Sequence, residues 1–178
     1  MTTLAEQLER IVGPNGLTTD PDELQPRLTE WRGDYEGRTR CMVRPASTEE
    51  VAAVVRHCAA SGTGIVAQGG NTGMCAAAIP DMSGDQIILS MERMNRVRNV
   101  DPTNFSMEVG AGCILANAQS AASAAGRFFP LSLGAEGTCQ IGGNIATNAG
   151  GINVGRYGTA RGLVLGLEVV LANGTVLN

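Results

Sequence analysis

The chain has 178 residues, 43% of them hydrophobic, so it is long enough to bury a core as one domain or as two small lobes. Its formal net charge is -4, and its 13 basic residues, all arginines, form no cluster, which argues against a nucleic-acid groove. No stretch reaches the roughly 20 apolar residues of a membrane span, and the N-terminus lacks the pattern of a signal peptide, so we expect a cytoplasmic protein.

The residue types that usually bind metals or nucleotides are sparse. The five cysteines are widely spaced without a C-x-x-C pair, and the single histidine is His57, so neither a disulfide framework nor a zinc site is expected. We predict reduced, mostly buried thiols, and we interpret His57, in an apparent helix, as a surface or packing residue. The absence of lysine excludes a Walker A phosphate loop.

The N-terminal part is predicted to be a helical lead-in arm, residues 1–41. One face of its first helix is apolar, with Leu4, Leu8, Ile11 and Val12. Gly13-Pro14 ends this helix, and a polar stretch with Trp31 follows.

A first lobe, at about residues 42–103, has the pattern of a β-α-β-loop-β unit. Ser47 followed by Glu50 forms a capping box, and the helix that begins there is expected to end before Gly62. The apolar stripe of this helix is Val51, Val54, Val55 and Cys58. Short buried strands are predicted at 65–67 and 87–89.

A second, mixed lobe is predicted at about residues 104–178. Phe105, Met107 and Val109 alternate with polar residues as in a strand with one buried face. A helix follows, with Leu115, Ala118, Ala122 and Ala125 on one face. The segment 163–172 reads as a strand, and Asn173-Gly174 predicts a hairpin turn. Because the return strand stops at Asn178, we expect a truncated domain, the front part of a longer protein.

Two glycine-rich segments carry the chemistry. The first is AQGGNTGM, residues 67–74, directly after a predicted strand. Its backbone N–H groups can converge on an anion such as a pyrophosphate, with Asn71 and Thr72 as side-chain donors. Gly70 is expected to adopt a conformation, or to allow a close ligand approach, that a Cβ would forbid. A tight turn between strands is the alternative, and the segment lacks the G-x-G-x-x-G fingerprint.

The second segment, FFPLSLGAEGTCQIGGNIATNAGG, covers residues 128–151. It has many amide and small side chains, so it suits a flat, polar-edged aromatic ligand that lies against the backbone. We therefore predict that its glycines make room for such a ligand.

These segments, together with RPASTEEVAAVVRHC, RYG and LGLEVVLANGTVL, occur in the order and spacing of a known family. From about Leu17 onward the chain resembles the FAD-binding PCMH-type domain of the vanillyl-alcohol oxidase family. Within it, the chain is most similar to the group of D-2-hydroxyglutarate dehydrogenase, D-lactate dehydrogenase and the FAD subunit of glycolate oxidase. The resemblance implies an α+β domain of two lobes, over residues 42–178, with an extended FAD between the lobes.

The resemblance also implies which residues bind FAD. The pyrophosphate loop corresponds to Gly69, Gly70, Asn71, Thr72 and Gly73. The segment that approaches the flavin ring corresponds to Gly134, Ala135, Gly137, Thr138, Gly142, Gly143, Asn144, Thr147, Asn148 and Gly150. The position of Val169 matches a strand whose backbone meets the adenine end. Covalent relatives use a histidine or cysteine at such loops, whereas Asn71 and Gln140 stand here, so noncovalent FAD is expected.

The implied reaction is the oxidation of a D-2-hydroxy acid to the 2-oxo acid, with hydride transfer to the flavin. The substrate residues of the family, and in several members a histidine-containing divalent metal site, lie in a C-terminal region beyond this chain, and the electron acceptor is not indicated. We therefore expect no catalytic residue in these 178 residues, no turnover by them alone, and weak or absent flavin in the purified chain. An alcohol or sugar-lactone oxidase on the same fold and a non-catalytic nucleotide-binding module are the alternatives.

Overall fold

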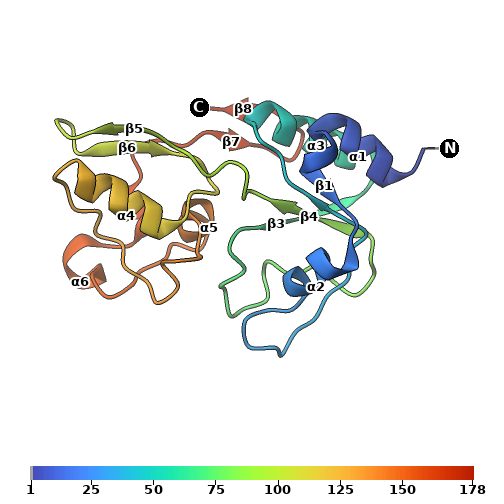
Figure 1. Cartoon of the computed structure of the whole chain (residues 1–178), viewed down its shortest axis with the longest axis horizontal. Helices are drawn as coiled ribbons and strands as arrows, with labels where there is room; N and C mark the ends of the chain where they lie inside the picture. Colours follow the sequence, from blue (N-terminus) through green and yellow to red (C-terminus); the bar gives the residue numbers. More distant parts are fainter. Residues whose placement is uncertain (1) are drawn as a thin grey trace. The chain divides into compact units, whose positions relative to one another are not determined.

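The computed structural model describes residues 2–178, which form two compact units. The first unit runs to Arg93 and resumes at Gly166–Asn178, and the second is Met94–Leu165. Each unit combines helices with strands (Figure 1). Within the described residues, no helix has the length and apolar character needed to cross a membrane.

The first unit is built on a four-stranded sheet in the order β1-β2-β4-β3. Its strands are β1 (Leu17–Thr18), β2 (Met42–Val43), β3 (Gly64–Gln68) and β4 (Gln86–Ser90). The strands β2, β4 and β3 are parallel, and β1 is antiparallel to β2. The two strands predicted at 65–67 and 87–89 form as the neighbours β3 and β4. The expected burial is confirmed for β4, whereas residues 65–67 of β3 are half-buried or exposed.

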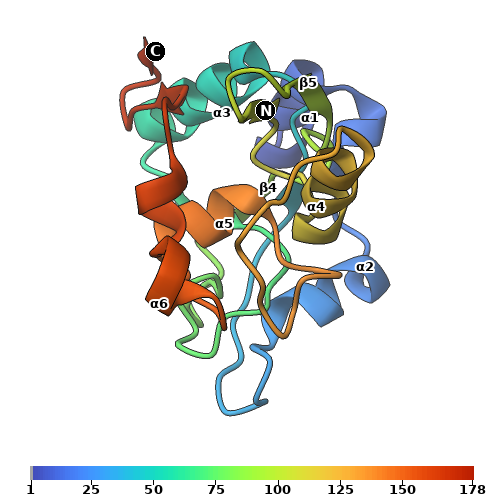
Figure 2. The same cartoon turned by 90° about the vertical axis from the view of Figure 1, so that its left-hand side faces the viewer.

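Helices cover both faces of this sheet (Figures 1 and 2). On one face, α1 (Leu4–Val12) and α3 (Thr48–Ser61) lie side by side. On the other face is α2 (Pro21–Leu28), where Leu24 packs against Met42 and Ile88. A short 3-10 turn, η1 (Pro14–Gly16), follows α1.

Local signals explain where α1 and α3 begin and end, and both predicted helices are confirmed. The Thr3 side chain caps α1, and Gly13 ends it at a φ of 73°. The Ser47 side chain accepts a hydrogen bond from the Glu50 N–H at the start of α3. Gly62, in the left-handed conformation, ends this helix as the sequence indicates.

The second unit contains a β-hairpin with a helix against it. The strands β5 (Val97–Asp101) and β6 (Ser106–Val109) are antiparallel, and α4 (Leu115–Ala124) packs beside β5 (Figure 1). Three short turns of helix follow, namely α5 (Ile141–Ala146), α6 (Val154–Tyr157) and η2 (Ala160–Leu163). The core of the unit is formed by Cys113, Leu115, Ala118, Leu131, Cys139, Ile141 and Ala160.

Two predicted strands differ from the structure. The strand predicted at 163–172 is wrong in extent. Its first residue, Leu163, is the last residue of η2, and only β7 (Val169–Val170) pairs, with β8 (Val176–Leu177). The hairpin at Asn173-Gly174 is confirmed. Phe105 does not face inward from a strand: it lies in the β5–β6 turn at a φ of 54° and is 77% exposed.

The compact units also differ from the lobes expected at 42–103 and 104–178. Since β5 pairs with β6, the second unit begins at Met94 rather than near residue 104. Residues 166–178 belong to the first unit because β7 packs against α3. The lead-in arm belongs to that unit too, because β1 is part of its sheet.

Candidate functional site

The first glycine loop, Gly69–Gly73, leaves the carboxyl end of β3. In the sheet of the first unit, β2 and β4 end at the same edge because they run parallel to β3. The carboxyl edge of parallel strands is where open α/β sheets bind their ligands. The loop therefore occupies a position that suits an anion-binding backbone.

One residue of this loop has an unusual backbone conformation. Asn71 is left-handed, with a φ of 51°, whereas Gly70 does not have a positive φ. The Asn71 Nδ2 donates to the Thr29 carbonyl oxygen at 2.9 Å. At least one N–H of this amide is thus engaged within the protein, although the sequence suggests a donor to the ligand.

Gln68, the last residue of β3, was not among the predicted site residues. Its side chain is 1% exposed, and its Nε2 donates to the carbonyl oxygens of Arg27 and Ala78 at 2.9 and 2.8 Å. Its Oε1 has no hydrogen-bond partner among the described residues. A polar residue at the end of a predicted strand, directly before glycines, is the sequence signal that could have identified it.

The second glycine segment lies in the second unit and is not a continuous loop. Its central part forms α5, which follows a turn at residues 134–138. The predicted residues that are exposed there are Gly134, Gly137, Thr138, Gly143 and Thr147. Those that are half-buried are Ala135, Gly142, Asn148 and Gly150, and Asn144 is buried.

The glycines of this segment fall into two groups. A Cβ at Gly134, Gly137 or Gly143 would meet no protein atom within 4 Å. A Cβ at Gly142 would lie 3.0 Å from the Ala111 carbonyl oxygen, so a larger residue there would be tightly packed against Ala111. Open glycines without a positive φ are not explained by the fold, and they leave the room that a ligand against the backbone would fill. The same holds for Gly73 in the first loop. The open space beside these glycines fits an FAD that lies against the backbone.

The asparagines and the threonine of this segment make hydrogen bonds within the unit. The Asn148 Oδ1 accepts from the Arg161 N–H at 3.1 Å, and Asn148 is left-handed with a φ of 51°. The Thr147 hydroxyl donates to the Gly143 carbonyl oxygen at 2.8 Å. The buried Asn144 Nδ2 lies 3.6 Å from the Cys139 Sγ. These contacts fix the backbone on which the open glycines lie.

The cysteines are free thiols, and four of the five are buried, as predicted. Burial raises the pKa of Cys139, which keeps this thiol neutral at physiological pH. Cys75, two residues after the first glycine loop, is exposed. His57 is half-buried on α3, and no group of three or more metal-ligating side chains occurs in residues 2–178.

Two further features of the second unit bear on where the site lies. Gln140, at the start of α5, has a buried Oε1 without a partner in the described residues, a feature that sequence reasoning missed. A pocket of about 320 Å³ in the second unit contains none of the predicted site residues. Its lining is Gln119, Ser123, Arg127, Phe128, Phe129, Ser132, Glu136 and Asn153. The candidate surface is therefore an open backbone surface, not this pocket.

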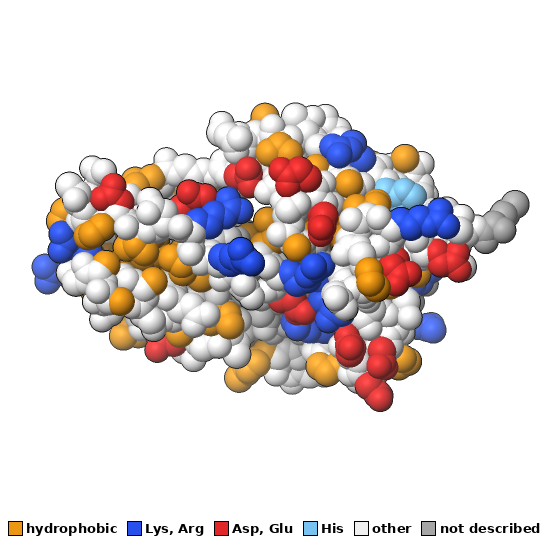
Figure 3. Space-filling view, turned by 45° about the horizontal axis from the view of Figure 1, so that its top comes forward, with side chains coloured by type: hydrophobic (Ala, Val, Ile, Leu, Met, Phe, Trp, Pro, Cys, Tyr) orange, Lys and Arg blue, Asp and Glu red, His pale blue; other side chains and the backbone are white. Residues whose placement is uncertain are grey.

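The structure places the predicted residues in different units. Gly69–Gly73 and Val169, the first residue of the exposed strand β7, belong to the first unit, and residues 134–150 belong to the second. The positions of the residues in each set are described only within the unit that contains them. On the face shown in Figure 3, acidic side chains lie among the arginine side chains.

Comparisons with known proteins agree with this geometry. Residues 39–178 match the model of a family described as FAD binding domain. The chain is 46% identical over 171 residues to the mitochondrial D-2-hydroxyglutarate dehydrogenase of Bos taurus, covering 96% of this chain and 31% of that protein. It is 38% identical over 158 residues to the D-2-hydroxyglutarate–pyruvate transhydrogenase of Saccharomyces cerevisiae, covering 89% of this chain and 32% of that one.

Among solved structures, an alkyldihydroxyacetonephosphate synthase superposes with a TM-score of 0.85 at 21% identity, over 96% of this chain and 33% of that one. This likeness confirms the predicted α+β fold of the PCMH type. The chain spans about a third of the length of the proteins that it matches.

Proposed function

This chain belongs to the FAD binding domain family, and on that premise we propose that it is the FAD-binding part of a dehydrogenase that oxidises a D-2-hydroxy acid to the 2-oxo acid. The observation that carries the cofactor assignment is the set of glycines whose Cβ positions are open, at Gly73, Gly134, Gly137 and Gly143. The substrate class rests on the 46% identity to a D-2-hydroxyglutarate dehydrogenase.

The residues proposed to hold FAD are those of the two glycine segments. Backbone N–H groups of Gly69–Gly73 would bind the pyrophosphate without a lysine, as charge-assisted hydrogen bonds worth about 1.5–3 kcal/mol each. In the second unit they are Gly134, Ala135, Gly137, Thr138, Gly142, Gly143, Asn144, Thr147, Asn148 and Gly150. The backbone of Val169 is proposed to meet the adenine end.

When bound, FAD would supply a hydride acceptor. The described residues orient this cofactor, whereas neither the histidine nor the arginines among them are suited to take the hydroxyl proton of a substrate. The single histidine is on α3, and arginines such as Arg156 and Arg161 are not bases at neutral pH. Substrate binding, any divalent metal and the electron acceptor are therefore assigned outside these 178 residues.

The experiment assays the gene product that contains these residues with D-2-hydroxyglutarate, D-lactate and glycolate and an artificial electron acceptor. We expect oxidation of one of the D-2-hydroxy acids, and no turnover above free FAD by the FAD-supplemented 178-residue chain. Oxidation of alcohols or sugar lactones, but of none of the three acids, would overturn the substrate class. Turnover by the 178-residue chain would show that catalytic residues lie within it, contrary to the proposal.

We further propose that FAD is held noncovalently. Asn71 and Gln140 occupy the loop positions where a nucleophile would be needed, and the nearby Cys139 is buried. Acid precipitation of the gene product should therefore release all of the flavin into the supernatant. Yellow colour in the pellet would identify a covalent link, with the exposed Cys75 as the first candidate.

The cytoplasmic location expected from the sequence stays a proposal. The bovine relative is mitochondrial by its name. Fractionation of the cells that express the gene would distinguish the two compartments, since recovery of the protein in an organelle fraction would contradict the proposal.

A further inference from the structure

The segment that precedes the family match packs against the first glycine loop. We call residues 27–38 the supporting segment. They comprise the end of α2 and the turn that follows it, and they lie before residue 39, where the family model begins. The stretch they contact is 68–81, which contains the glycine loop and the turn after it.

Hydrogen bonds join the supporting segment to both ends of the stretch 68–81. At its beginning, the side-chain amides of Gln68 and Asn71 donate to the carbonyl oxygens of Arg27 and Thr29. At its end, the Arg38 N–H donates to the Asp81 carbonyl oxygen at 3.0 Å. Gly37 packs so closely on the Pro80 carbonyl that a Cβ there would clash with it.

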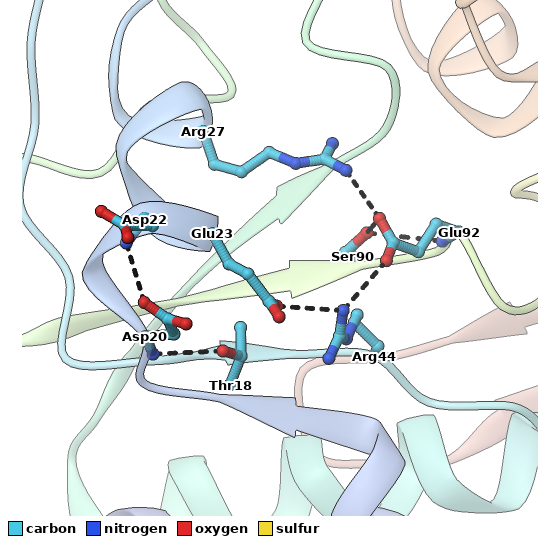
Figure 4. Close-up of polar contacts among 8 residues, drawn as sticks. All are labelled: Thr18, Asp20, Asp22, Glu23, Arg27, Arg44, Ser90 and Glu92. Carbon is cyan, nitrogen blue, oxygen red and sulfur yellow. Dashed lines mark hydrogen bonds and ion pairs between the residues drawn. The ribbon is translucent and has the colours of Figure 1, made fainter.

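The helix that presents these carbonyls is itself fixed by ion pairs (Figure 4). The Arg27 guanidinium lies 2.7 Å from one oxygen of Glu92, which follows β4. Arg44, which follows β2, lies 3.5 Å from the other oxygen of Glu92 and 3.3 Å from Glu23 on α2. The Arg27–Glu92 pair is about 28% exposed on both sides, so water screens it only in part.

The energetics explain why such a support matters for binding. The loop has three glycines in five residues, and glycine loses more conformational entropy on ordering than any other residue. The last carbonyls of a helix have no partner within the helix, so Arg27 and Thr29 offer free acceptors at the end of α2. Side-chain donors from Gln68 and Asn71 satisfy them and order the loop before a ligand arrives.

We infer that the supporting segment preorganises the glycine loop for the FAD pyrophosphate. Gln68 and Asn71 are positioning residues: the side chain of Asn71 acts through Thr29 and not on the ligand. This inference rests on the proposed FAD site, and it assigns a function in cofactor binding to a part of the chain outside the family model.

The first test is Asn71→Gly, which keeps the left-handed backbone and removes the side-chain donor. We expect faster amide hydrogen exchange in residues 69–78 of the FAD-free chain, and a Kd for FAD raised about fivefold, the equivalent of one hydrogen bond. Ala76→Gly is the matched control, because Ala76 is also left-handed, with a φ of 54°, and donates no side-chain bond. It should change both readouts much less.

The second test acts on the helix and leaves the loop sequence intact. Arg27→Met removes the ion pair with Glu92 and should also accelerate exchange in residues 69–78 and weaken FAD binding. Arg40→Met is its control, since it removes an exposed ion pair with Asp85 in the same unit. The control should leave loop exchange and FAD affinity unchanged.

The outcomes separate this inference from the proposed function. A weaker FAD affinity of Asn71→Gly with unchanged exchange in the FAD-free loop would mean that Asn71 contacts the ligand, and would overturn the inference. If the wild-type gene product that contains these residues bound no FAD, the proposed cofactor would be wrong, and the inference about the supporting segment would fail with it. Faster loop exchange in both variants would then still establish the contact between the two segments.

Discussion

At the scale of single residues, the glycines of the second glycine segment differ in whether the fold itself explains them. Gly142 has little room for a side chain beside Ala111, and Gly151 is required by its φ of 81° beside the Ser132 carbonyl oxygen. Gly137 has neither reason, since a Cβ there would meet open space. A glycine that packing does not require and that lies in a matched cofactor segment is best explained by a ligand close to the backbone.

We predict that Gly137→Val lowers the affinity for FAD at least tenfold and changes the free energy of unfolding of the FAD-free chain by no more than about 0.5 kcal/mol. Urea unfolding and a fluorescence titration measure the two quantities. Gly162→Val is the control, because Gly162 is equally open in η2 and is not a candidate site residue. Equal FAD affinities of the two variants would remove Gly137 from the site.

The site residues stay a prediction, and residue identities alone did not predict what each side chain contacts. The positions of Gly134 and Gly143 follow from the matched segment, and their exposure agrees with it. The contact of Asn71 with Thr29 could not be predicted, because it joins residues 42 positions apart. Such a contact depends on where α2 lies, which no local pattern encodes.

At the scale of elements, local signals predicted α1, α3 and α4, whereas elements that depend on tertiary contacts were missed. Two glycines, each costing about 1 kcal/mol relative to alanine, hide α5 from a propensity argument. It forms because Ile141 is part of the core of its unit. The strand expected at 163–172 shortens to β7 because its pairing partner β8 is only two residues long.

The β7–β8 hairpin offers a prediction at this scale. Gly174 has a φ of 77°, and a Cβ there would lie 2.9 Å from the Ala52 carbonyl oxygen of α3. The Arg56 guanidinium donates to the Gly174 carbonyl oxygen at 2.9 Å. We expect Gly174→Ala to lower the free energy of unfolding by about 1 kcal/mol or more.

Urea unfolding of this variant and of Gly166→Ala measures the effect. Gly166 begins the same C-terminal stretch of the first unit, and a Cβ at that position would meet no atom within 4 Å. The Gly166 variant should unfold at the wild-type urea concentration. If both variants behaved alike, the close contact between the hairpin and α3 would be contradicted.

At the scale of the whole molecule, the chain consists of two α+β units, each with one glycine segment of an FAD-binding family. The fold class and the family were predictable because the motifs occur in a characteristic order. The division of the chain was not, because residues 166–178 return to the first unit through contacts with α3 that are more than 100 positions away in sequence. The central claim is that the backbone surfaces of these units bind the pyrophosphate and the ring of FAD.

The most direct test is a titration of the FAD-free gene product that contains these 178 residues with FAD and, separately, with riboflavin, which has the flavin ring but no pyrophosphate. Quenching of flavin fluorescence reports binding. We predict saturable binding of one FAD per chain and at least tenfold weaker binding of riboflavin, because the glycine loop would have no anion to hold. Equal affinities for the two flavins, or no saturable binding of FAD, would contradict the claim.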